Sequence, residues 1–284
     1  IATIDTKEIG PDGKEIQRKL SKRKDTEKAL VSSHFERGYP PVAVEAYLLS
    51  ILDSQFEVWR LANPHKPLSE YAFSAKGIKK SNNALYDADK LASISKEEIG
   101  NMTAEQVYAH ALNWAKDYGQ DAILSALENE EYALAVLGIE RGGAKPRKDL
   151  VTWTDIPEKL GFFFDELYAG AVDTSAISRF SPDVIAGVIN EVMSKYSEEL
   201  SLEDWQKLML EIAANNGFAT DNKLYKANPE AYKGSRADVF TIIRTLVAGR
   251  NISPDLYSVM KVMGKERLKG RLERGLNSLE PVRE

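Results

Sequence analysis

The sequence has 284 residues, 43% of them hydrophobic, so it is long enough for two or three domains with packed cores. The absence of cysteine excludes disulfides and thiolate metal sites, and the 3 histidines show no ligand spacing, so we expect no bound metal. A formal net charge of −5 excludes a generally basic nucleic-acid binder. No apolar run approaches the roughly 18 residues of a membrane helix and no signal peptide is visible, so we expect a cytoplasmic protein. Because the chain starts at Ile1, we interpret it as part of a longer protein.

The first informative segment is a basic run near the start of the chain. Gly10-Pro11-Asp12-Gly13 predicts a tight turn, so a hairpin is expected over residues 1–18. The residues expected on the exposed loop that follows are Lys19, Leu20, Ser21, Lys22 and Arg23. Ammonium groups beside a hydroxyl suit the binding of a polyphosphate. On charge alone, a solvated surface loop is the commoner explanation of such a run.

Most of the remaining sequence shows the apolar spacing of amphipathic helices. Val44, Tyr47 and Ile51 share one face of a first helix, which we expect to be core. Capping patterns at Thr103, Ser181 and Ser253 mark later helix starts. The spacing predicts helices over residues 104–118, 121–137, 182–196, 202–212, 236–249 and 254–263. We therefore predict a mainly α fold.

Two further segments bear on nucleic-acid binding. The connector at Lys145–Lys148 offers cations to a phosphate backbone, although a solvated loop is the favoured interpretation. Phe162–Phe164 are expected in the core, and a stacking platform for RNA bases is the less favoured alternative. The last helices carry more basic than acidic side chains, part of which complements the helix dipole and needs no ligand.

Five strings, in this order, resemble segments of the glutamyl-tRNA synthetase family, which belongs to the class I aminoacyl-tRNA synthetases. Each string alone is a weak signal, and the ordered set is specific. At Lys24-Asp25 the family usually has His-Gly, so the loop departs from the common pattern there. The strings are KLSKR at Lys19–Arg23 (the family's KMSKS loop), GYPP at Gly38–Pro41, ALYDADKL at Ala84–Leu91, FFF at Phe162–Phe164, and GRNISPDL followed by GKER within Gly249–Arg267.

The resemblance implies a small α/β stem-contact region followed by an all-helical anticodon-binding region of two subdomains. The expected domains are 1–101, with the KMSKS-type loop and stem contact, then 102–175 and 176–284, the two helical subdomains. In this family the loop binds ATP with magnesium, and its second lysine, here Lys22, stabilises the pyrophosphate. The family activates glutamate and charges tRNA-Glu, so the implied partner is that tRNA, with tRNA-Gln as an alternative, and a monomer is expected.

The family's other signature, a His-Ile-Gly-His-type motif, does not occur in this sequence. The resemblance therefore implies a portion of the enzyme from the KMSKS loop onward, inactive by itself and holding no ATP. Arg244, Arg250, Lys265 and Arg267, on the basic C-terminal face, are the candidates for binding tRNA. Two alternatives stay open: a helical scaffold that binds another protein, and a stand-alone paralogue in another tRNA pathway.

Overall fold

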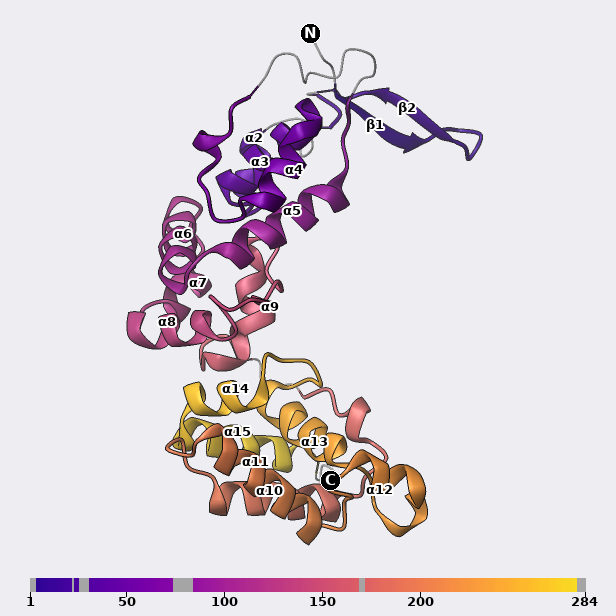
Figure 1. Cartoon of the computed structure of the whole chain (residues 1–284), viewed down its shortest axis with the longest axis vertical. Helices are drawn as coiled ribbons and strands as arrows, with labels where there is room; N and C mark the ends of the chain where they lie inside the picture. Colours follow the sequence, from indigo (N-terminus) through magenta and orange to yellow (C-terminus); the bar gives the residue numbers. More distant parts are fainter. Residues whose placement is uncertain (1–3, 22, 26–30, 74–83, 169–171, 280–284) are drawn as a thin grey trace, which may run out of the picture. The chain divides into compact units, whose positions relative to one another are not determined.

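The computed structural model describes residues 4–21, 23–25, 31–73, 84–168 and 172–279. Internal contacts divide the chain into two compact units. The first unit comprises Ile1–Glu128 and Arg141–Lys159, and the second comprises Asn129–Glu140 and Leu160–Glu284. Helices dominate both units, and a small sheet lies near the start of the chain (Figure 1). The predicted mainly α fold is confirmed.

The sheet of the first unit consists mainly of the predicted hairpin. Strand β1 (Ile4–Ile9) pairs antiparallel with β2 (Glu15–Lys19), and the short β3 (Ala84–Leu85) runs parallel to β1 on its other side. Gly13 has a φ of 76° and closes the turn, where Gly10 N–H donates to Lys14 O at 2.8 Å. The hairpin extends away from the neighbouring helices (Figure 1). It therefore carries the basic loop at its base, where β2 ends.

Beside the hairpin, the first unit contains α2 (Val31–Glu36), α3 (Pro41–Leu52), α4 (Ser54–Ala62), a 3-10 turn (Leu68–Glu70) and α5 (Ala88–Asn101). Helix α3 packs against α5, and Tyr39, Val44, Tyr47 and Leu91 form their shared core. Asp87 N–H donates to the Tyr47 hydroxyl at 2.8 Å. The apolar face that was expected to be core is buried, except that Ile51 is only partly buried.

Helix α6 (Ala104–Asp117) starts at the predicted capping box of Thr103 and Gln106. The single helix predicted over 121–137 is wrong, because the structure has α7 (Asp121–Ala126) and α8 (Glu130–Gly138). The Asn129 side chain accepts from Tyr132 N–H at 3.0 Å and starts α8 as an N-cap. Short helical pieces follow: a 3-10 turn (Trp153–Asp155), α9 (Ile156–Leu160) and a 3-10 turn (Gly161–Phe163). Phe162, Phe163 and Phe164 are all buried, as expected.

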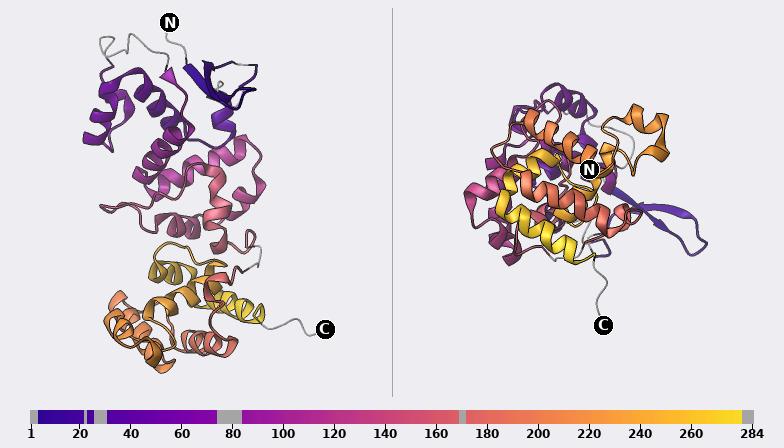
Figure 2. Two further views of the ribbon diagram at one scale, coloured as in Figure 1. Left: turned by 90° about the vertical axis from the view of Figure 1, so that its right-hand side faces the viewer. Right: turned by 90° about the horizontal axis from the view of Figure 1, so that it is seen from below.

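The rest of the second unit is helical, and Figure 2 shows its helices packed on one another. Helix α13 (Arg236–Ala248) lies at the centre and packs against α10 (Pro182–Lys195), α11 (Leu202–Asn215) and α15 (Lys265–Asn277). Its buried face includes Val239, Ile243 and Leu246, as the sequence predicts. The elements are a 3-10 turn (Ser175–Ile177), α10 (Pro182–Lys195), α11 (Leu202–Asn215), α12 (Asn222–Ala227), a 3-10 turn (Pro229–Ala231), α13 (Arg236–Ala248), α14 (Leu256–Met263) and α15 (Lys265–Asn277).

Gly38 is a position in the first unit where only glycine fits. Its φ is 85°, and an added Cβ would lie 3.1 Å from the backbone nitrogens of both Trp153 and Thr154. We expect Gly38→Ala to lower the free energy of unfolding by about 1–2 kcal/mol, because backbone strain and this close approach act together. Gly13→Ala is the matched control in urea denaturation, since Gly13 has a φ of 76° and nothing within 4 Å. Equal losses in the two variants would contradict a role for the close approach.

Candidate functional site

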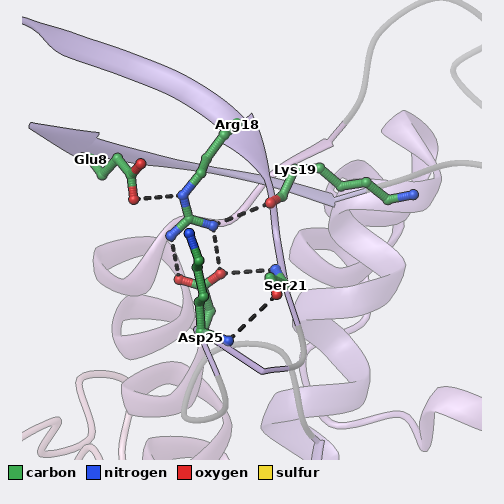
Figure 3. Close-up of polar contacts among 6 residues, drawn as sticks. Glu8, Arg18, Lys19, Ser21 and Asp25 are labelled. Carbon is green, nitrogen blue, oxygen red and sulfur yellow. Dashed lines mark hydrogen bonds and ion pairs between the residues drawn. The ribbon is translucent and has the colours of Figure 1, made fainter. Parts of the chain in front are cut away.

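The basic loop starts at the end of β2 and turns back on itself (Figure 3). The Ser21 carbonyl accepts from Asp25 N–H at 2.7 Å, and the Ser21 hydroxyl accepts from Lys24 N–H at 3.4 Å. Ser21 is therefore committed to local structure. Lys19 and Arg23 are exposed, and the Lys19 side chain points away from the turn (Figure 3). Leu20 is half-buried, and Lys22 lies outside the described residues.

Arg18, which precedes the basic loop and was not singled out from the sequence, also organises it. Its Nη1 and Nη2 donate to the two carboxylate oxygens of Asp25 at 2.7 and 2.9 Å. Its Nε donates to Glu8 Oε2 at 2.5 Å, from the neighbouring strand β1. The hydrogen bonds that Arg18 donates to Asp25 and then to Glu8 raise the pKa of Arg18 above its usual value. The fork geometry of arginine, which matches a carboxylate, was the available signal, since Arg18 and Asp25 flank the basic run.

Two of the four candidate residues for tRNA lie around the end of α13. Arg244 is half-buried, its Nε donates to Ser253 Oγ at 3.0 Å, and burial lowers its pKa. Arg250 follows the left-handed Gly249 and is also half-buried. Ile252, in the same loop, is 72% exposed. The loop thus presents an apolar tip beside two arginines.

The predicted N-cap at Ser253 is wrong, because Asp255 caps α14 by accepting from Ser258 N–H at 2.9 Å. The Ser253 hydroxyl instead donates to Pro254 O. Glu140, with a φ of 53°, accepts from Asp255 N–H at 3.1 Å. A non-glycine residue in the left-handed region is uncommon. Glu140 lies just after α8, and its carboxylate fixes the end of the loop 250–255 through this hydrogen bond.

The other two candidates lie in the first turn of α15 and differ in their surroundings. Lys265 is exposed. Arg267 is half-buried, lies 4.4 Å from the ring centre of Tyr132 and donates from Nε to Asp165 Oδ2 at 3.2 Å. Lys265 and Arg267 line one surface hollow, together with Asp165, Glu198 and Arg274. Lys265 is therefore the cation of this pair whose charge faces water.

The connector Lys145–Lys148 offers fewer available cations than its sequence suggested. The Arg147 side chain is 6% exposed and its Nε lies 3.0 Å from Asp149. Lys148 Nζ lies 2.6 Å from Glu97. Lys145 is exposed. Two of these three cations are thus held by carboxylates of the same unit.

Among the described residues there is neither a cluster of metal ligands nor a helix suited to a membrane. No group of three or more His, Asp or Glu side chains there has the arrangement to hold a metal ion. Within the same residues, no helix is both long enough and apolar enough to cross a membrane.

Comparisons with known proteins identify the same family as the sequence motifs. The chain is 36% identical over 263 residues to a glutamate–tRNA ligase of Acetivibrio thermocellus and 38% identical over 262 residues to that of Clostridium perfringens. These alignments cover 91% and 92% of this chain but 47% of each relative, so the chain spans about half the length of the curated relatives it matches. The resemblance drawn from the sequence is confirmed.

A solved glutamate–tRNA ligase from Elizabethkingia meningosepticum has the same fold over 98% of this chain and 51% of its own, with a TM-score of 0.65 and 17% identity. Residues 106–276 match the family described as "Anticodon binding domain". That match covers more than half of the 284 residues. The chain belongs to the anticodon-binding-domain family.

Proposed function

We propose that this chain is the tRNA-binding portion of a glutamate–tRNA ligase, which activates glutamate with ATP and charges tRNA-Glu. One observation carries the proposal: the similarity to glutamate–tRNA ligases covers 91% of the chain and so extends well beyond the anticodon-binding-domain match at residues 106–276. Residues 1–101 would carry the KMSKS-type loop and the stem-contact domain, and residues 102–175 and 176–284 would form the two helical anticodon-binding subdomains. A single chain, acting as a monomer, would bind one tRNA.

In this proposal the basic loop binds ATP in the intact ligase. The residues concerned are Lys19, Leu20, Ser21, Lys22 and Arg23. The exposed ammonium of Lys19 and guanidinium of Arg23 suit phosphate oxygens, which bind cations strongly when water is excluded. The remaining chemistry would need a nucleotide-binding fold that this sequence does not contain, so the chain alone would form no glutamyl-adenylate and would hold neither ATP nor magnesium.

The tRNA contact would be made by cations of the second unit. Arg244, Arg250, Lys265 and Arg267 are the candidates. Lys265 is exposed and Arg250 adjoins the exposed tip at Ile252, so these two are best placed for phosphate contact. Arg244 and Arg267 are held by Ser253 and Asp165, so they support the surface as well as add to its charge.

A binding titration with tRNA-Glu tests the proposal. If each of the four cations neutralises about one phosphate, the logarithm of the association constant should fall with the logarithm of salt at a slope of about −3. We expect Lys265→Glu with Arg250→Glu to weaken binding about tenfold and to make that slope shallower by about 1–2. Lys223→Glu is the matched control, because Lys223 is exposed in the same unit on α12.

Two outcomes would contradict this reading. Salt-independent or absent tRNA binding at low salt would favour a protein scaffold. Glutamate-dependent ATP–pyrophosphate exchange by the purified chain would show that it is active alone. Comparing tRNA-Glu with tRNA-Gln then decides which tRNA is the partner.

A further inference from the structure

The Asp25 carboxylate joins the two ends of the basic loop. It receives two hydrogen bonds from Arg18, the last-but-one residue of β2, and Ser21 N–H donates to its Oδ2 at 2.8 Å. The Asp25 N–H returns a bond to Ser21 O at 2.7 Å. Side-chain and backbone contacts thus join Arg18 and Ser21 to Asp25 (Figure 3).

Burial separates this clasp, made of Arg18 and Asp25, from the residues that it encloses. The Asp25 side chain is 8% exposed and that of Arg18 is 25% exposed. Lys19 and Arg23, by contrast, are exposed. Charge-assisted, bidentate pairs are the strongest hydrogen bonds in proteins, and partial burial protects this pair from screening by salt. The clasp can therefore hold the loop without using the cations that face water.

Glu8 ties the clasp to the sheet. It lies on β1, and its Oε2 accepts from Arg18 Nε at 2.5 Å. Arg18 is paired with two carboxylates, those of Glu8 and Asp25, so the three side chains together carry a net charge of −1. Arg18 itself is therefore not available to bind an anion. The Arg18 guanidinium therefore contacts both Asp25 in the loop and Glu8 in the hairpin, and so fixes the loop relative to the hairpin.

We propose that Arg18 and Asp25 are positioning residues, which hold the loop in one shape so that Lys19 and Arg23 face a polyphosphate. The phosphate part rests on the proposed function, and the clasp itself does not. A loop that is ordered beforehand loses less conformational freedom when the ligand binds. Asp25 stands where the related family usually has glycine, so this chain would fix its loop through a side chain.

The first experiment tests the clasp in this chain alone. Trypsin cleaves after Lys19, and we expect Asp25→Asn, which keeps the shape but removes the charge, to raise the initial rate of cleavage at the Lys19–Leu20 bond about tenfold. In the same variant, hydrogen exchange of the backbone amide of residue 25, which is bonded to Ser21 O, should accelerate to a similar extent. Glu15→Gln is the matched control, because it removes the Lys7–Glu15 ion pair of 2.8 Å from the same hairpin. Unchanged cleavage and exchange in Asp25→Asn would overturn the clasp.

The second experiment uses a full-length glutamate–tRNA ligase that contains this segment. Asp25→Asn should raise KM for ATP in pyrophosphate exchange about tenfold, and Arg18→Lys, which keeps the charge but loses the fork, should do the same to a lesser degree. Lost protection with unchanged KM would leave the clasp standing and overturn the ATP role of the loop. A lower KM in Asp25→Asn would show that Asp25 competes with phosphate, and would overturn positioning.

Discussion

Replacing Trp153 by alanine should lower the free energy of unfolding of the first unit by about 3–5 kcal/mol. The indole is 1% exposed and stacks on His110 with ring centres 6.3 Å apart. Its backbone N–H donates to Gly38 O at 2.9 Å, so it joins segments that are more than a hundred residues apart. Truncation removes a large apolar surface and leaves a cavity that the surrounding helices cannot fill.

Hydrogen exchange followed by mass spectrometry can check this, because it reports the opening of each unit separately. Peptides from α6 and α2 should lose protection, while peptides from α13 should keep theirs. Trp153→Phe is the control, since it retains an aromatic ring on His110 and should cost less than half as much. A loss shared equally by α13 would contradict the division into two units.

Local signals in the sequence predicted the fold well. The capping pattern at Thr103, the one at Ser181 and the end of the helix predicted over 254–263 all lie where the structure has them. Each of these signals acts through the backbone groups of one helix end, so it can be read without knowing the rest of the fold. The buried run Phe162–Phe164 was predictable for a similar reason, because three adjacent aromatic side chains need cover on every side.

The errors also have local causes. Apolar spacing continues across Leu127 and Asn129, which suggested one helix, but the Asn129 side chain caps a new one. At Ser253 two capping residues compete, and Asp255 takes the role while Ser253 bonds to Arg244. Spacing alone does not decide between candidate caps, since the tertiary contacts of each side chain determine which is free to bond to the backbone.

The candidate sites could be predicted only as sets of residue types. The basic loop and the basic end of the chain were evident, but not which cations are held by carboxylates. Asp165 lies about a hundred residues before Arg267, and no spacing rule joins them. Arg18 and Asp25 are only 7 residues apart in the sequence. Their contact nevertheless depends on the turn that brings the two ends of the loop together.

The second large effect concerns Arg271, which lies on α15 beneath the candidate surface. Its side chain is 0% exposed, Nη2 lies 2.8 Å from Asp165 Oδ1, and the guanidinium lies 3.8 Å from the ring centre of Tyr168. Burial lowers its pKa. Among the described residues, its Nε and Nη1 have no hydrogen-bond acceptor. The residue is therefore a buried charge with one ion-pair partner, which is weak evidence for stabilisation by charge.

We expect Arg271→Glu to lower the free energy of unfolding of the second unit by more than about 4 kcal/mol, because it buries a carboxylate against Asp165. Arg271→Met should change it by no more than about 1 kcal/mol, since methionine keeps the volume beneath Tyr168 and removes the desolvated charge. Asp165 can lose its ion pair with Arg271 at little cost, because its side chain is 51% exposed and is still paired with Arg267. Urea denaturation checks both stabilities, and tRNA affinity of Arg271→Met should match that of the parent chain, because the surface cation Lys265 is untouched. Equal destabilisation by methionine and glutamate would mean that the ion pair, and not the packed volume, holds α15 in place.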